Sequence, residues 1–134
     1  ALGADHVINY VEDEHWSDTV RKVSGGGVDH VIDIGGRATL QQSINAARTS
    51  GQISLVGILG GVTATVNVPM IFSKQLQVHG VAVGSAAMQD AMTRAVENGQ
   101  IKPVIDADYD LADIADAFAY QASAQHFGKV TLSI

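Results

Sequence analysis

Two short β-branched segments, each ending at a pair of glycines, constrain the fold of this chain more than any other feature. Residues 28–36 read VDHVIDIGG and residues 51–61 read GQISLVGILGG. Between them Leu40, Ile44 and Ala47 recur at helical spacing. The pattern predicts a strand–helix–strand unit. Ligands of open α/β sheets bind beside the carboxyl ends of the strands, and glycine lets the backbone approach a ligand closely. The sequence therefore indicates a nucleotide-type crevice without naming the nucleotide.

The same alternation of strands and helices continues along the chain. The residue pattern predicts strands at 6–10, 28–34, 52–58, 77–83, 104–109 and 128–134, and helices at 16–23, 39–47, 69–74, 86–98 and 111–118. Strands separated by helices through residue 84 predict a parallel sheet with right-handed crossovers. Beyond residue 84 the predicted order is helix–strand–helix–strand, which differs from the first part and predicts a second structural unit. Trp16, Met88 and Met92 are expected in the core.

Composition excludes several classes of protein. The 134 residues are 46% hydrophobic and 16% charged, which is typical of one globular domain. A net charge of -6 without a basic cluster argues against nucleic-acid binding. Cysteine is absent, which excludes disulfides and thiolate metal sites, and no apolar run approaches the roughly 20 residues of a membrane span. The start of the chain has no signal-peptide pattern, so a cytoplasmic location is the default expectation.

Four segments in order resemble one enzyme family. ALGADHVINY at 1–10, VIDIGG at 31–36, GQISLVG at 51–57 and HFGKV at 126–130 look like the medium-chain dehydrogenase/reductase family, best in its zinc-type alcohol dehydrogenase and quinone oxidoreductase branches. The resemblance implies an α/β fold: an incomplete Rossmann-type parallel sheet followed by a C-terminal α+β segment. Residues 1–84 would be the second part of the dinucleotide-binding domain, and residues 85–134 the segment that returns to the catalytic domain of a longer subunit.

The resemblance also implies what this stretch lacks. The family's G-x-G-x-x-G loop, its cofactor-selecting residue and its catalytic zinc ligands would all lie upstream of Ala1. We therefore expect no catalytic residue and no metal ligand in these 134 residues, although zinc is possible in the parent enzyme. The chain alone should be inactive and should bind NAD or NADP weakly. The predicted strand at 6–10 would also lack its neighbours in the sheet.

Candidate coenzyme-binding residues follow from the family resemblance. They lie at the ends of three predicted strands: Gly35, Gly36, Val56, Gly57, Ile58, Val83, Gly84 and Ser85. Lys129 could reach the pyrophosphate as a point charge, or it could be a solvated surface lysine. Tyr10 would lie near the adenosine, with a half-exposed packing residue as the alternative.

Four further residues carry specific expectations. Asp33 is expected to orient a loop by accepting backbone N–H bonds rather than to act in catalysis. His126 is a candidate for a role near the substrate or the pyrophosphate. Gly57 is expected to leave space for the nicotinamide ribose, so that valine there should impair coenzyme binding. Lys74 ends a surface helix, and alanine there is expected to impair coenzyme binding far less than valine at position 57.

Three functional hypotheses remain open at this point. The first is an oxidoreductase segment whose parent transfers hydride between NAD or NADP and an alcohol/carbonyl pair or an activated alkene or quinone. The second is a non-catalytic assembly module, in which residues 77–83 pair across a dimer axis to form a homo-oligomer. The third is a Rossmann-like domain for another nucleotide, such as a methyltransferase segment. The Gly84-Ser85 turn and the closing GKV at 128–130 count against the third.

Overall fold

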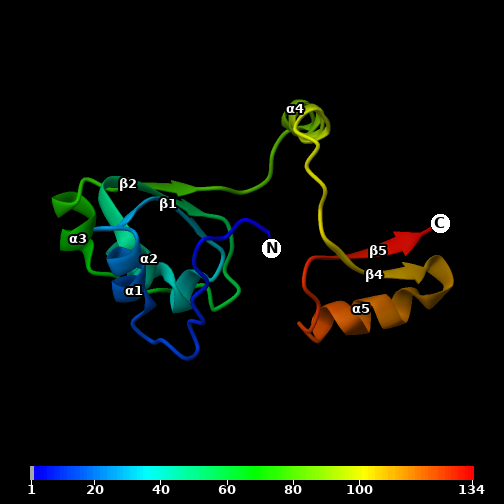
Figure 1. Cartoon of the computed structure of the whole chain (residues 1–134), viewed down its shortest axis with the longest axis horizontal. Helices are drawn as coiled ribbons and strands as arrows, with labels where there is room; N and C mark the ends of the chain where they lie inside the picture. The colour runs from blue at the N-terminus through cyan, green and yellow to red at the C-terminus, as the bar shows by residue number, and fades with distance from the viewer. Residues whose placement is uncertain (1) are drawn as a thin grey trace. The chain divides into compact units, whose positions relative to one another are not determined.

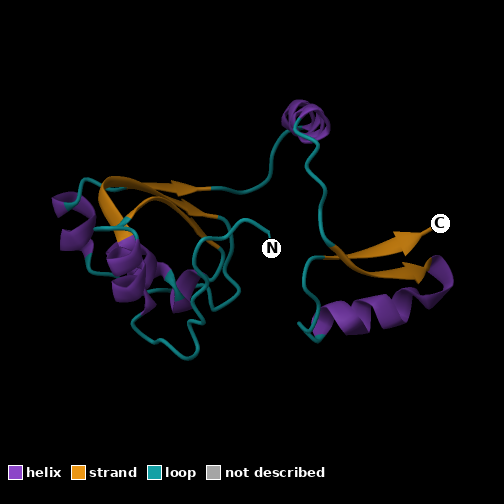
Figure 2. Cartoon of the chain, viewed as in Figure 1, coloured by secondary structure: helices purple, strands orange, loops and turns teal. Residues whose placement is uncertain are grey.

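The computed structural model describes residues 2–134; Ala1, the first residue of the predicted Rossmann segment, lies outside the described residues. The chain divides into two compact units, one up to Val83 and one at Gly84–Ile134. Each unit has its own parallel sheet (Figures 1 and 2). Within residues 2–134, no helix is both long enough and apolar enough to cross a bilayer.

The first unit is built on a three-stranded parallel sheet, as the sequence predicts. Its strands β1 (Val28–Asp33), β2 (Ala47–Leu55) and β3 (Gln77–Gly80) lie side by side in chain order. The register pairs Ile53 of β2 with Val31 of β1 and with Val78 of β3. The three strands therefore bring their carboxyl ends to the same edge of the sheet.

Helices α1 (Trp16–Val23), α2 (Leu40–Ala46) and α3 (Val68–Ser73) alternate with these strands. Ile44 of α2, Ala47 and Ile53 form the buried centre of the unit. Partly buried hydrophobic residues pack around this centre: Val31, Leu40, Leu55, Val66, Met70, Ile71 and Leu76. The core therefore lies between α2, α3 and one face of the sheet, where removal of apolar surface from water stabilises the unit.

Lys74, the residue directly after α3, caps the C-terminus of α2. The ammonium of Lys74 donates hydrogen bonds to the carbonyls of Ile44 (2.9 Å), Asn45 (2.8 Å) and Ala47 (2.9 Å). Arg21 of α1 also reaches the Asn45 carbonyl, at 3.4 Å. Burial, and secondly the positive charge of Arg21, lowers the pKa of Lys74 below its ordinary value. Lys74 therefore has a structural role that the sequence analysis did not predict, because it satisfies carbonyls that the helix end leaves without partners. The smaller effect of Lys74 on coenzyme binding stays a prediction.

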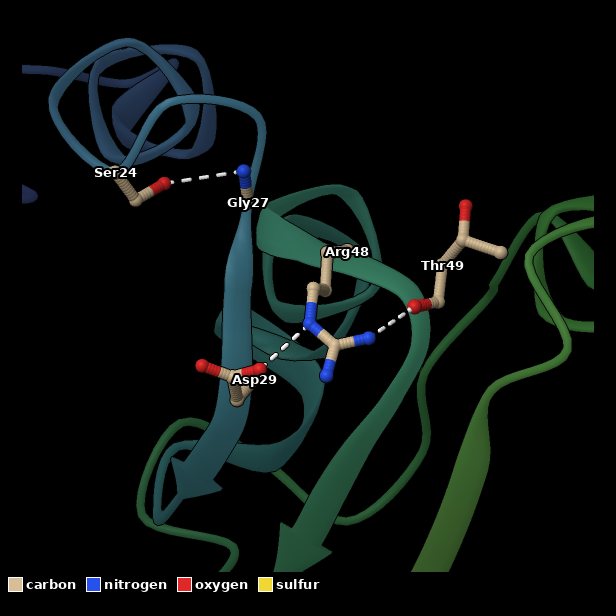
Figure 3. Close-up of polar contacts among 5 residues, drawn as sticks. All are labelled: Ser24, Gly27, Asp29, Arg48 and Thr49. Atoms are coloured by element: carbon tan, nitrogen blue, oxygen red, sulfur yellow. Dashed lines mark hydrogen bonds and ion pairs between the residues drawn. The ribbon is translucent and has the colours of Figure 1, made fainter.

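The opposite edge of the sheet, where β1 and β2 begin, is held by a short polar network (Figure 3). The hydroxyl of Ser24 accepts a hydrogen bond from Gly27 N–H at 3.0 Å. Arg48 Nε lies 2.6 Å from Asp29 Oδ1, and Arg48 Nη1 donates to the Thr49 carbonyl at 2.6 Å. Both partners of the ion pair are exposed, so the pair adds little stability. A Cβ on Gly27 would lie 2.7 Å from the backbone nitrogen of Arg48, so the strands can approach here only with glycine.

The predicted strand at 6–10 does not form. Residues 2–15 contain no helix or strand, and Asn9 starts a turn instead, since its side-chain oxygen accepts from Val11 N–H at 3.1 Å. A strand needs neighbours for its backbone N–H and C=O groups. The sheet order places no described strand beyond β1, so the segment lacks the partners that its β-branched residues would require.

The second unit consists of α4 (Ala86–Asn98), β4 (Ile105–Asp110), the 3-10 turn η2 (Leu111–Asp113), α5 (Ile114–Ala122) and β5 (Lys129–Ser133). The strands β4 and β5 pair in parallel, and α5 connects them. Gly128 enters β5 at a φ of +114°, and a Cβ there would lie 2.5 Å from the Val104 carbonyl. This turn therefore requires glycine.

Predicted elements beyond residue 15 are present, with shifted ends. The helices at 16–23 and 86–98 match the sequence prediction, whereas β2 ends at Leu55 and β3 at Gly80, three residues before the predicted ends. The expectation that Met88 and Met92 are core residues is wrong: they are 65% and 59% exposed. Their spacing gives α4 an apolar face, but periodicity cannot show whether such a face has a partner.

Candidate functional site

A pocket of about 440 Å³ lies beside the carboxyl end of β1. Its walls come from the segment before α1, from α1, β1 and α2, and from the loops that follow β1 and β2. Tyr10 and Trp16 line one side; Asp33, Gly35, Leu59 and Gly60 are among the other lining residues. A neighbouring pocket of about 280 Å³ shares Tyr10, Trp16 and Thr39 with it. Of the predicted site residues, Tyr10 and Gly35 thus meet at one cavity.

Asp33, the last residue of β1, organises the loop after that strand. Its side chain is 2% exposed. Oδ1 accepts hydrogen bonds from Gly35 N–H (3.1 Å), Gly36 N–H (2.8 Å) and the Thr39 hydroxyl (2.8 Å). Oδ2 accepts from the Ser43 hydroxyl on α2 at 2.6 Å. The expectation that Asp33 orients a loop by accepting backbone N–H bonds is confirmed.

The loops after β1 and β2 are joined by their backbones. The bonds between them are Val56 N–H to Asp33 C=O (2.8 Å), Leu59 N–H to Ile34 C=O (3.1 Å), Gly60 N–H to Gly35 C=O (2.7 Å) and Arg37 N–H to Gly61 C=O (3.1 Å). We refer to residues 34–39 and 56–61 together as the paired loops. Since neither loop can shift without breaking bonds to the other, they form one wall of the pocket.

Close packing of the paired loops explains their glycines. A Cβ on Gly57 would lie 2.7 Å from the Ile34 carbonyl oxygen. Gly36 has a φ of +64°, and a Cβ there would lie 2.9 Å from the Gly61 carbonyl oxygen. The sequence-based reason for glycine at position 57, space for the nicotinamide ribose, is therefore not the first constraint. A larger residue would meet the backbone of the neighbouring loop before any ligand.

The structure brings some of the predicted coenzyme-binding residues together. Five of them lie in the paired loops: Gly35, Gly36, Val56, Gly57 and Ile58. Val83, Gly84 and Ser85 follow β3 at some distance along the chain, because this strand ends at Gly80. Lys129 opens β5 in the second unit.

Ser85 has a structural role that the sequence analysis missed. Its hydroxyl oxygen accepts a hydrogen bond from Met88 N–H at 3.3 Å and so caps the N-terminus of α4. The signal was present in the sequence, since serine directly before a run of helix formers is a typical N-cap. Val83, two residues earlier, is 97% exposed.

His126 lies in an aromatic cluster of the second unit. Its ring packs edge-on against Tyr120, with ring centres 6.1 Å apart. Its Nδ1 is buried and has no hydrogen-bond partner among the described residues. The hydroxyl of Tyr120 donates to Asp106 Oδ2 at 2.6 Å, and this bond is the main cause that raises the pKa of Tyr120. The predicted role of His126 near a substrate or pyrophosphate stays a prediction.

Zinc does not fit the residues of this chain. The sequence has no cysteine, and residues 2–134 bring no three histidine, aspartate or glutamate side chains together as a metal site. Asp33, the buried carboxylate at the pocket, already accepts four hydrogen bonds. No step of a reaction can therefore be assigned to zinc held by these residues alone.

Trp16 and Leu59 line the pocket, a position that the sequence analysis did not predict for either residue. Trp16 was expected in the core because it starts an apolar helical pattern, and it is partly buried. Its contact with the pocket depends on how the segment before α1 turns, which helical periodicity does not report. Leu59, flanked by loop residues, carries no periodic signal and is 85% exposed.

Comparison with known sequences identifies the family. The family model described as "zinc-binding dehydrogenase" matches residues 2–132. A zinc-type alcohol dehydrogenase-like protein of Schizosaccharomyces pombe is 36% identical over 138 residues, which cover 99% of this chain and 40% of that protein. Quinone oxidoreductase-like protein 2 of Mus musculus is 31% identical over 98% of this chain and 40% of that protein. The chain thus spans about 40% of the length of these curated relatives.

Solved structures agree with the sequence comparison. A crystal structure of an NAD-dependent alcohol dehydrogenase matches with a TM-score of 0.85 at 31% identity, over 98% of this chain and 38% of that one. A 2-octenoyl-CoA carboxylase reductase, solved in complex with NADP and 2-octenoyl-CoA, matches with a TM-score of 0.83 at 27% identity, over 97% of this chain and 33% of that one. The chain belongs to the zinc-binding dehydrogenases of the medium-chain dehydrogenase/reductase family.

Proposed function

We propose that this chain is the coenzyme-binding segment of an NAD(P)-dependent oxidoreductase. The reaction would be hydride transfer between the nicotinamide coenzyme and an alcohol/carbonyl pair or an activated alkene or quinone. The observation that carries the proposal is the wall formed by the paired loops at the carboxyl ends of two parallel strands, beside a pocket of about 440 Å³. Ligands of open α/β sheets bind at this edge, and pockets of this volume suit small molecules and cofactors.

The proposed coenzyme contacts are the residues expected from the sequence. The paired loops would supply Gly35, Gly36, Val56, Gly57 and Ile58; Tyr10, Val83, Gly84, Ser85 and Lys129 would supply the rest. Residues 1–84 would complete the dinucleotide-binding domain, and residues 85–134 would return to the catalytic domain. The coenzyme supplies the hydride chemistry when bound, and this chain's residues bind it, orient it and exclude water.

The wall suits an apolar or ring-shaped part of the coenzyme better than its phosphates. Gly35 and Gly36 direct their N–H groups to Asp33, so these donors are already used. Tyr10, Trp16 and Leu59 give the pocket aromatic and apolar surface. The pyrophosphate would therefore need donors from elsewhere in the protein. The 134-residue chain alone should bind the dinucleotide weakly and should not turn over substrate.

Calorimetric titration with NADH and NADPH tests the proposal. Two proteins are compared: the 134-residue chain, and its natural sequence extended at the amino end toward the length of the curated relatives. We expect micromolar binding of one coenzyme by the extended protein and no measurable binding by the chain alone. An extended protein that binds neither coenzyme contradicts the proposed function. Micromolar binding by the 134-residue chain alone contradicts the proposal that part of the coenzyme site lies outside this chain.

A second proposal, which can hold beside the first, is that this segment assembles the protein into a homo-oligomer. β3 lies at an edge of the sheet and is exposed along its whole length. Val81 and Val83, which follow it, are 47% and 97% exposed. Unpaired strand edges tend to find partners, and two-fold pairing closes them. Val81→Lys or Val83→Lys should reduce the mass measured by light scattering; a wild-type monomer at micromolar concentration contradicts the proposal.

A further inference from the structure

Asp33 connects three parts of the candidate site through a single residue. Its Oδ1 holds the first paired loop by two backbone N–H groups and the Thr39 hydroxyl. Its Oδ2 holds α2 through Ser43. Its own carbonyl accepts from Val56 N–H and Gly57 N–H, at 2.8 and 3.3 Å, in the second paired loop. The loop after β1, the helix behind it and the loop after β2 are therefore all fixed to the last residue of β1.

Because the Asp33 carboxylate is buried, the position of the first paired loop depends strongly on its hydrogen bonds to this carboxylate. A buried charge is tolerated only when hydrogen bonds replace its water, and a carboxylate that loses donors in a buried site is costly. The Asp33 side chain is 2% exposed, and four donors surround it. If the first loop moved away, three of these donors would leave. The conformation of the loop is therefore tied to the satisfaction of this carboxylate.

The same geometry argues against direct chemistry at Asp33. Oδ1 accepts three hydrogen bonds and Oδ2 accepts one short bond of 2.6 Å. A general base needs a free lone pair within reach of the proton that it removes. The Asp33 carboxylate lines the pocket, but its acceptor positions are directed to the chain itself. Its effect on a ligand would pass through Gly35, Gly36 and the loop bonded to them.

We propose that Asp33 is a positioning residue for the coenzyme, which holds the paired loops in the conformation that forms the pocket wall. This inference rests on the proposed function, because it names the device that shapes the same site. The carboxylate acts through hydrogen-bond geometry rather than through charge on the ligand. An amide at this position can reproduce most of that geometry: its oxygen can take the place of Oδ1 toward the first loop, and the Ser43 hydroxyl can turn to accept from its NH2 group.

The test uses the extended protein and compares three variants. Asp33→Ala removes both acceptor oxygens, whereas Asp33→Asn keeps the oxygen that holds the first loop and replaces Oδ2 by an NH2 group. Lys74→Met removes the α2 cap, which lies outside the residues that line the pocket. Coenzyme Kd is measured by calorimetry at a temperature where circular dichroism shows every variant folded. We expect Asp33→Ala to raise Kd at least about tenfold and Asp33→Asn to stay within about threefold of wild type, because only the former loses the loop's acceptor. Lys74→Met should lower the Tm yet leave Kd unchanged.

The outcomes separate this inference from the proposed function. Wild-type protein that binds neither coenzyme contradicts the function itself. Coenzyme binding with an unchanged Kd in Asp33→Ala overturns the positioning role, and so does a Kd that rises equally in Lys74→Met, since that would reflect general loss of stability. If Asp33→Ala does not fold, Thr39→Val replaces it, because it removes one donor to Oδ1. A severalfold rise in Kd supports the role, and an unchanged Kd overturns it.

Discussion

The hydroxyl of Ser43 donates a 2.6 Å hydrogen bond to Oδ2 of Asp33, ten residues earlier in the chain. Both side chains are buried, at 1% and 2% exposure. The bond joins the end of β1 to the middle of α2, which crosses over to β2. Two residue types that usually face solvent thus lie inside the first unit because each satisfies the other.

Ser43→Ala should destabilise the first unit. The substitution leaves Asp33 Oδ2 buried without its donor, and an unsatisfied buried polar group costs about 1–3 kcal/mol. Denaturant unfolding followed by circular dichroism measures the change. Ser73→Ala, at the exposed end of α3, is the matched control and should change the free energy of unfolding by no more than about 0.5 kcal/mol. Equal effects of the two substitutions would contradict the role assigned to the buried pair.

Lys74→Met should also lower stability, although the sequence alone gave no sign of a structural role for this lysine. The variant keeps the length of the side chain but removes the donor to three carbonyls at the end of α2. We expect a loss of about 1–2 kcal/mol, because Lys74 is only partly buried. Lys22→Met on the exposed side of α1 is the control and should have a much smaller effect. If the unfolding midpoints of both variants equal that of wild type, the Lys74 hydrogen bonds do not contribute to stability.

Gly57→Ala should be more damaging than Gly80→Ala. A Cβ at position 57 would lie 2.7 Å from the Ile34 carbonyl oxygen, whereas a Cβ at position 80 would have no atom within 4 Å. Overpacking of this kind typically costs about 1–3 kcal/mol. Thermal unfolding of the two variants checks the order. The idea that packing of the paired loops requires glycine fails if Gly57→Ala is as stable as Gly80→Ala.

Asp108 should titrate at lower pH than an unperturbed aspartate. Hydrogen bonds from Ser133 and then Thr131, both 2.6 Å long, lower the pKa of Asp108 below 3.8. A lowered folded-state pKa means that the contribution to stability is present above the unfolded-state value and is lost as pH falls through the folded-state value. NMR titration of the Asp108 carboxyl measures the midpoint.

The control for this titration is the double variant Thr131→Val and Ser133→Ala, which removes both donors while β4 and β5 keep their backbone pairing. We expect the Asp108 midpoint to move upward toward 3.8. An unchanged midpoint would mean that the hydroxyl groups of β5 do not determine the titration of this carboxylate.

Local sequence signals predicted much of the fold and part of the site. Apolar spacing gave α1 and α4 with their observed ends, and β-branched runs that stop at glycines gave β1 and β2 in a parallel sheet. The position of Asp33 after an apolar run and before Gly35-Gly36 predicted its contacts with the following backbone. These features succeed because they depend on residues close together in the chain.

The remaining features depend on partners far away in the sequence. The β-branched residues at 6–10 form no strand because no described strand lies beyond β1 to pair with them. Met88 and Met92 are exposed although their spacing predicted a core position. Helical periodicity shows that α4 has an apolar face, but it does not show whether another element packs on that face. The role of Lys74 requires α3 to lie at the end of α2, about thirty residues apart in the chain.

By itself, the sequence determined the helices and paired strands beyond residue 15, apart from their exact ends, and the family to which the protein belongs. Tertiary structure alone decided that the loops after β1 and β2 bond to each other, that Gly57 packs on Ile34, and that Trp16 lines the pocket beside them. The physical reason is the range of the interactions. Dihedral preferences and hydrophobic periodicity depend on residues that are close together in the sequence. Packing and hydrogen bonds between loops, in contrast, form only once the sheet has placed the strand ends side by side.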